Sequence, residues 1–122
     1  MFEPGHLNRK KQPGIPGVPD FDIDVYYDVR HDPKEGVLLH FRMTGQVNGR
    51  SFTDEFEMHR DTAFNFASRI AKAAVKQGLP VNASPIMRSH SEYDAMFADI
   101  RRKLEIRTGE PVNFDNLEKD GF

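Results

Sequence analysis

Cysteine and tryptophan are both absent from the 122 residues of this chain. The lack of cysteine excludes disulfides, zinc ribbons, cysteine nucleophiles and dithiol redox motifs, and it fits a reducing compartment. Long apolar runs are missing too: no segment approaches the ~20 residues of a membrane span, and the first residues show no apolar stretch of signal-peptide length. We therefore expect a soluble cytoplasmic protein that makes no membrane contact.

A continuous basic surface is also lacking. Residues 21–59 carry four basic and eight acidic side chains, whereas residues 60–108 carry nine and five. A general nucleic-acid binder needs one continuous basic face, so this distribution argues against nucleic acid as a partner. The run of Arg101, Arg102 and Lys103 keeps nucleic-acid binding as a third hypothesis, although cations near a helix end are also favoured by the carbonyl dipoles.

The first 20 residues contain four prolines and three glycines. Proline removes backbone donors and disfavours helix. A chain of this length supports a single core without disulfide or metal staples. The sequence therefore predicts an extended arm over residues 1–20, one α+β domain over residues 21–109, and an acidic tail over residues 110–122.

Strict alternation of apolar and polar residues begins at Phe21 and resumes after a turn at residues 31–36. Asn48 and Gly49 predict a two-residue hairpin, because both turn positions need positive φ. The resulting register opposes three informative pairs: Phe41 with Phe56, Arg42 with Glu55, and His40 with Glu57. Apolar meets apolar and cation meets anion, which supports the hairpin independently.

After Asp61 the apolar period changes to ~3.6, which predicts a helix capped by Asp61 or Thr62 and ended by Gly78. A second helix begins near Ser89 or Ser91 and continues towards Gly109. We therefore predict an α+β fold: a three-stranded antiparallel β-meander with two C-terminal α-helices packed on one face (β-β-β-α-α). The helices are the only predicted elements long enough to cover the apolar face.

The opposite, polar face of the predicted sheet holds the candidate site. Its residues are Asp28, His40, Arg42, Glu55, Glu57 and His59. A histidine flanked by carboxylates can act as a general base or help to hold a divalent metal. Alternating charges are also typical of an ordinary solvated face, where each pair contributes only ~0.2–1 kcal/mol. We therefore predict a ligand-binding surface and assign no catalytic residue, metal ligand or cofactor.

Three motifs carry a family resemblance: "MFEPGHL" at the start, then "DIDVYYDVR" and "LLHFRMTGQV" after a basic, proline-rich stretch. The chain resembles a family of short bacterial proteins classed as a domain of unknown function, and the resemblance covers nearly the whole chain. It implies a cytoplasmic bacterial protein of this length. It brings no catalytic residues that could be carried over.

Two main hypotheses of function follow. The first is a non-enzymatic interaction or small-ligand-binding module that forms a homodimer, using the polar sheet face, an exposed strand edge or the N-terminal arm. Its motivation is that a three-stranded sheet leaves two edges, which invite either protection or pairing. The alternative is an enzyme or metal-binding protein that uses the polar face around His40 and Glu57, with His59 and Asp28 nearby.

Overall fold

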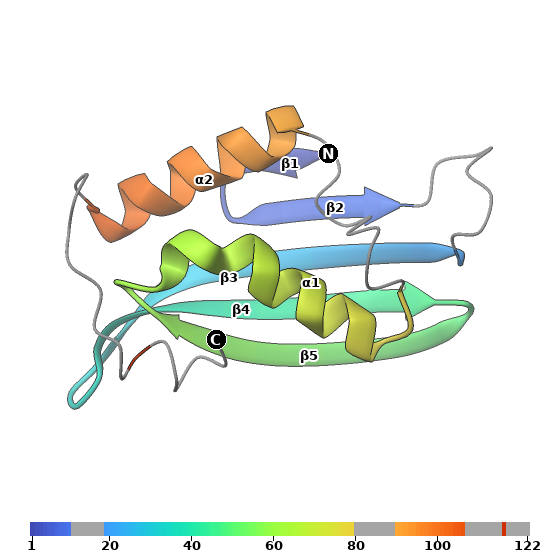
Figure 1. The fold of residues 1–122 in the computed structure, drawn as a ribbon, viewed down its shortest axis with the longest axis horizontal. Helices are drawn as coiled ribbons and strands as arrows, with labels where there is room; N and C mark the ends of the chain where they lie inside the picture. Colours follow the sequence, from blue (N-terminus) through green and yellow to red (C-terminus); the bar gives the residue numbers. More distant parts are fainter. Residues whose placement is uncertain (11–18, 80–89, 107–115, 117–122) are drawn as a thin grey trace.

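The computed structural model describes residues 1–10, 19–79, 90–106 and 116, and within them the chain forms one antiparallel sheet and two α-helices (Figure 1). The strands are β1 (Phe2–Glu3), β2 (His6–Lys10), β3 (Phe21–Asp32), β4 (Gly36–Val47) and β5 (Arg50–His59), in that order across the sheet. The helices are the 3-10 helix η1 (Ala63–Asn65), then α1 (Phe66–Lys76) and α2 (His90–Leu104).

The predicted meander is formed by β3, β4 and β5. Asn48 and Gly49 adopt φ values of 51° and 76°, as the two-residue hairpin requires. The three predicted cross-strand pairs between β4 and β5 are confirmed. Between β3 and β4, Asp28 lies opposite His40 and Tyr26 lies opposite Arg42. Two carboxylate-bearing strands therefore flank β4 on its polar side.

The sheet has five strands, so the prediction of three was wrong. The N-terminal segment adds β1 and β2 along the edge of β3. On the helix-facing side of β2 the only apolar residue is Leu7, and the next residue on that side is Arg9, so no apolar alternation marks the strand. Arg9 is accommodated there because its guanidinium bonds to Glu92 of α2 at 3.0 Å. The rest of the predicted arm at residues 11–18, and the tail apart from Asn116, lie outside the described residues.

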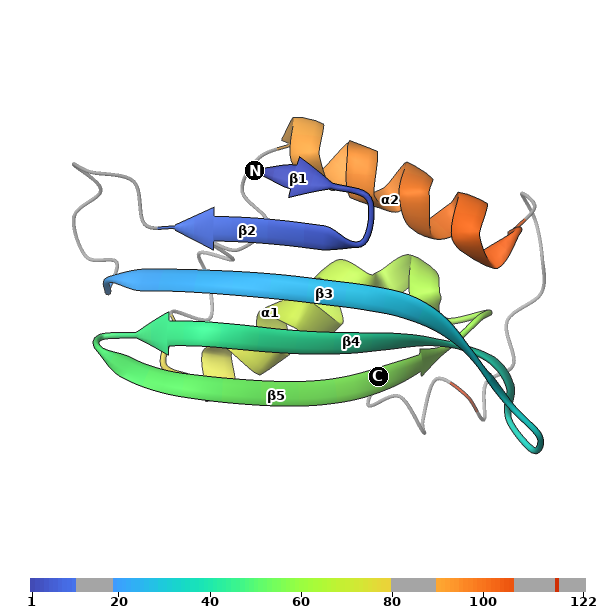
Figure 2. The same ribbon diagram turned by 180° about the vertical axis from the view of Figure 1, so that it is seen from behind.

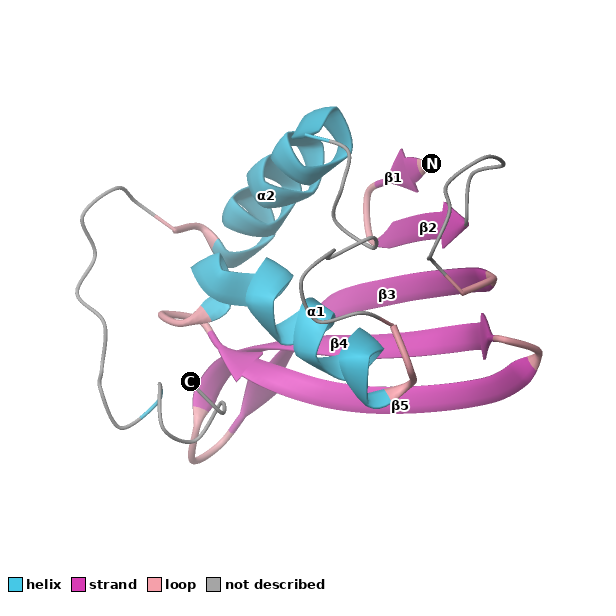
Figure 3. Ribbon diagram, turned by 45° about the vertical axis from the view of Figure 1, so that its right-hand side comes forward, coloured by secondary structure: helices cyan, strands magenta, loops and turns pink. Residues whose placement is uncertain are grey.

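Both helices lie on one face of the sheet, which we call the inner face (Figures 1 and 3). α1 buries Phe66, Ile70, Ala73 and Ala74, and α2 buries Met96, Ile100 and Leu104. The centre of the core is the stacked pair Phe41 and Phe56, with ring centroids 4.9 Å apart. The predicted cap by Asp61 or Thr62 is not formed: Thr62 precedes η1 without a side-chain cap hydrogen bond, its hydroxyl donates to the His59 carbonyl at 3.1 Å, and the N-cap residue of α1 is Asn65.

The reverse of the sheet, which we call the outer face, has no described helix over it (Figure 2). Apart from Leu38, which lies beside Arg30 and His59, and the Tyr26 ring, its side chains are mostly polar, and they come from alternate residues of the same strands that form the core. No helix in the described parts of the chain is long and apolar enough to cross a membrane. The candidate site lies on this outer face, on hydrogen-bonded strands, and no described helix covers it.

Candidate functional site

An open depression of about 630 Å³ lies on the outer face. The side chains that matter for its chemistry are Tyr26, Asp28, Arg30, His40, Arg42 and Glu55, which come from β3, β4 and β5. Four of these are residues of the predicted site: Asp28, His40, Arg42 and Glu55. The antiparallel register brings them together from segments that are separate in the sequence.

Two predicted site residues do not line this depression. Glu57 lies opposite His40 in the register and is exposed, but it is not among the residues that line the depression. His59 is 8% exposed, and its Nε2 lies 2.8 Å from the Glu35 carboxylate in the turn between β3 and β4. The structure therefore separates His59 and Glu57 from the cluster around His40.

His40 is held between two carboxylates. Its Nδ1 lies 3.3 Å from Asp28 Oδ1 on β3, and its Nε2 lies 3.9 Å from Glu55 Oε1 on β5. The ring is only 8% exposed, so its orientation is fixed by the strands on both sides. Among the described residues, no group of three or more histidine, aspartate or glutamate side chains is placed to hold a metal ion. His40 thus supplies an ordered polar wall to the depression.

Arg42 lies opposite Glu55, as the sequence predicts, but the expected ion pair is not formed. The Glu55 carboxylate approaches His40 instead. Within the described parts of the chain the exposed Arg42 guanidinium makes no hydrogen bond or ion pair, whereas Arg30 bonds to Asp28 at 3.3 Å. A guanidinium is suited to carboxylate and phosphate groups, which it binds through two parallel hydrogen bonds. Arg42 is therefore a cation available to a ligand.

Tyr26 and His6 form a platform that the sequence did not predict. Their rings stack with centroids 4.4 Å apart and planes 6° from parallel. His6 Nε2 lies 2.7 Å from Asp24 Oδ1, which fixes the imidazole behind the tyrosine ring. This stacking was not predicted from the sequence, because His6 was assigned to an arm outside the sheet. In the structure His6 belongs to β2 and lies opposite Tyr26.

A buried polar cluster lies on the other side of the sheet, between β3 and α2. Tyr27 and Lys103 both donate hydrogen bonds to Oδ2 of Asp99, which is 3% exposed, and Arg102 bonds to its other oxygen. Burial alone would raise the pKa of Asp99, but the hydrogen bonds from Lys103 and Tyr27 outweigh it and hold that pKa below its usual value. Burial and the Asp99 carboxylate raise the pKa of the Tyr27 hydroxyl well above its usual value. These contacts fix α2 against the sheet.

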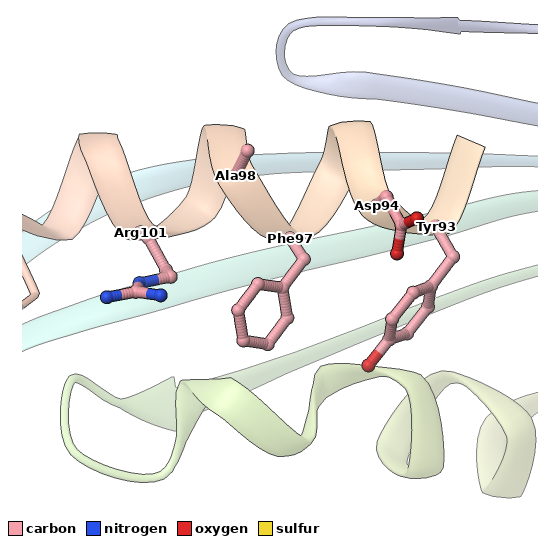
Figure 4. Close-up of a pocket in the computed structure, with 5 residues that line it drawn as sticks. All are labelled: Tyr93, Asp94, Phe97, Ala98 and Arg101. Carbon is pink, nitrogen blue, oxygen red and sulfur yellow. The ribbon is translucent and has the colours of Figure 1, made fainter. Parts of the chain in front are cut away.

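A second depression, of about 580 Å³, lies beside α2 (Figure 4). Tyr93, Phe97 and Arg101 project from one side of the helix, and Asp94 and Ala98 complete the lining. The Tyr93 and Phe97 rings lie 5.5 Å and 6.0 Å from Phe66 of α1. This surface joins aromatic rings to a carboxylate at one end and a guanidinium at the other.

A family model described as a domain of unknown function (DUF5064) matches residues 1–117. The chain belongs to this family. The solution structure of an uncharacterised protein from Pseudomonas aeruginosa is similar, with 46% sequence identity and a TM-score of 0.74, covering 98% of this chain and 94% of that one. No curated protein matches the chain.

The first seven residues of this DUF5064 chain build the edge of the sheet. Gly5, at φ 85°, forms the turn between β1 and β2, and its carbonyl accepts a hydrogen bond from the Tyr27 amide at 3.1 Å. Leu7 is 1% exposed and enters the core, while His6 faces outwards onto Tyr26. The opening motif thus has a structural role and also places His6 behind the candidate site.

Proposed function

We propose that this DUF5064 protein is a non-enzymatic small-ligand-binding module whose site is the depression on the outer face. The observation that supports the proposal is that Asp28, His40, Arg42 and Glu55 line one concavity in which Arg42 has no described partner. Binding sites are typically concave and combine a few fixed polar groups with apolar or aromatic walls.

The strands supply the rigidity that a binding site requires. His40 is held between carboxylates from β3 and β5, and Tyr26 is held by His6, so both are positioned before a ligand arrives. Groups fixed in this way lose little entropy on binding. Both ring nitrogens of His40 face carboxylates within 3.9 Å, which supports a positioning role over proton transfer to a substrate.

The test is a titration of ¹⁵N-labelled protein with a panel of small organic anions, cations and neutral compounds, followed by NMR. We expect at least one class to shift the amide resonances of Tyr26, Asp28, His40, Arg42 and Thr53 together at concentrations up to ~10 mM. Shifts that gather at Tyr93 and Phe97 instead, or no shift with any compound, would contradict the proposal.

An enzyme or metal-binding protein centred on His40 and Glu57 is the alternative, and it requires Glu57 to turn into the depression. Zinc titrated into the labelled protein tests this alternative. Broadening or shifts confined to His40, Glu57 and Asp28, abolished by His40→Ala, would favour it over simple ligand binding.

The proposed module includes a homodimer, and the surface beside α2 supports this assembly best. Asp94 and Arg101 lie about two helical turns apart on the same surface. If α2 of a second copy packed antiparallel to this helix, with the two-fold axis between Phe97 and Ala98, each Asp94 would face the Arg101 of the other copy. The edge of β5 is less suitable, because Glu55 and Glu57 line its outer side and two copies would repel each other.

Light scattering after size-exclusion chromatography tests the homodimer. We expect twice the chain mass of 14.0 kDa at micromolar concentration. Asp94→Arg should dissociate the dimer by opposing like charges, and the combined Asp94→Arg and Arg101→Asp variant should restore it. A monomeric wild type, or a double variant that stays as monomeric as the single one, would contradict this interface.

A further inference from the structure

We infer that the outer-face depression binds a planar organic anion, with the ring of the ligand on Tyr26 and its anionic group on Arg42. The inference rests on the proposed function and names the class of ligand. It follows from the placement of one aromatic ring and one unpaired cation on neighbouring strands.

The Tyr26 ring has one face covered and one face available. His6 stacks on it from β2, while Arg42 lies on its other side on β4, because β3 runs between these two strands. Tyr26 lines the depression and is 40% exposed. The ring face turned away from His6 is therefore a wall of the depression. An aromatic face that is backed and held in place suits a flat ligand, which can stack on it.

Arg42 supplies the cation that lies next to this wall. Arg30, the other arginine of the depression, is already bonded to Asp28. Tyr26 and Arg42 are direct cross-strand neighbours, and such residues lie roughly 4.5–5.5 Å apart at their Cα atoms. A carboxylate attached directly to an aromatic ring has the size to reach the guanidinium while its ring lies on Tyr26.

The contacts of the charged residues around the depression distinguish Arg42 from the others. Asp28 contacts both His40 and Arg30, and Glu55 approaches His40. Asp24, behind the platform, accepts hydrogen bonds from His6 and Asn8. Glu57 makes no such contact with a described residue, but it does not line the depression. Of the charged side chains that line the depression, Arg42 is therefore the one without a contact to an oppositely charged or imidazole group among the described residues.

Three probes of similar size separate the two features of the ligand. Benzoate is planar and charged, cyclohexanecarboxylate is charged but not planar, and benzamide is planar but neutral. Titrated into the ¹⁵N-labelled full chain, benzoate should bind with a Kd on the order of 1 mM and shift the resonances of Tyr26, His40 and Arg42. Cyclohexanecarboxylate and benzamide should each bind ~5- to 10-fold more weakly, since each lacks one of the two contacts.

Two variants assign the contacts, each with a matched control. Arg42→Gln should reduce benzoate affinity to that of benzamide, whereas Arg50→Gln removes the same charge from the hairpin and should change it less than ~2-fold. Tyr26→Leu should reduce benzoate affinity to that of cyclohexanecarboxylate, whereas Phe64→Leu removes an exposed ring elsewhere and should leave it unchanged. Amide spectra of each variant confirm that the sheet is intact.

The outcomes separate the inference from the proposed function. Equal binding of benzoate and cyclohexanecarboxylate, or of benzoate and benzamide, would overturn the planar anion while leaving the site in place. The same holds if other compounds of the panel shift Tyr26, His40 and Arg42 but the three probes do not. If nothing shifts these residues, both the inference and the proposed function fail.

Discussion

The two faces of the sheet are made by alternate residues of the same strands, yet they differ in burial and polarity. On β4, Phe41 and Met43 are fully buried on the inner face, while Arg42 between them is exposed on the outer face without a described partner. The inner face is closed by both helices, and the outer face has no described helix over it (Figures 1 and 2). Stability is thus concentrated on one side, and the other side is free to present polar groups.

Substitutions at two adjacent residues of β4 should show the largest difference in free energy of unfolding between the two faces. Phe41→Ala removes a fully buried ring stacked on Phe56 and should lower the free energy of unfolding by ~3–5 kcal/mol. Arg42→Gln, on the outer face, should change it by less than ~0.5 kcal/mol. Urea denaturation followed by circular dichroism measures both, and similar losses for the two variants would erase the distinction.

Gly45 on β4 lies against the backbone of β3. A Cβ at this position would lie 2.0 Å from the Asp22 carbonyl oxygen, and φ is 149°, so Gly45→Ala should cost ~2–4 kcal/mol. Gly49→Ala is the control, because Gly49 also has positive φ but nothing within 4 Å of its Cβ position; we expect ~1 kcal/mol. Thermal and chemical denaturation measure the loss of stability in both variants. An equal loss for Gly45→Ala and Gly49→Ala would contradict the close approach of β3 to β4.

The polar cluster at Asp99 shows that the inner face also holds charge where α2 packs. Asp99→Asn leaves Lys103 and Arg102 without their carboxylate and should cost ~1–3 kcal/mol at pH 7. Glu105→Gln removes an exposed charge just after the same helix and should cost less than ~0.5 kcal/mol. Hydrogen exchange of α2 amides gives the same comparison locally. Equal protection in both variants would show that Asp99 does not fix the helix.

The same cluster predicts a smaller effect of pH. Because the folded-state pKa of Asp99 is lowered, its contribution to stability is complete above the unfolded value of ~3.9 and is lost as pH falls through the folded value. Stability should therefore decline below about pH 4, and Asp99→Asn should make the decline shallower. Unfolding curves collected from pH 6 to pH 2 provide the measurement. An identical decline in both proteins would place the titrating groups elsewhere.

The meander and its register could be predicted because the information is local. Asn48 and Gly49 fix the hairpin, and alternation along β3, β4 and β5 fixes which side is buried. The hairpin register places four of the six predicted site residues, His40, Arg42, Glu55 and Glu57, on one face, because cross-strand neighbours must share a face.

The missing features depend on contacts between distant residues. β2 was not predicted because Arg9 occupies an inner position, and the Glu92 that compensates it is 83 residues away. The Tyr26 platform needs His6, which faces it only once β2 is in the sheet. Arg42 was expected to pair with Glu55, and only the side-chain positions show that Glu55 approaches His40 instead.

One variant tests the division of the two faces most directly. Arg42→Gln should keep the wild-type free energy of unfolding within ~0.5 kcal/mol and at the same time weaken benzoate binding by ~5- to 10-fold. Urea denaturation and the NMR titration are made on the same sample. A loss of stability above ~1 kcal/mol, or benzoate binding equal to that of the wild type, would contradict the account.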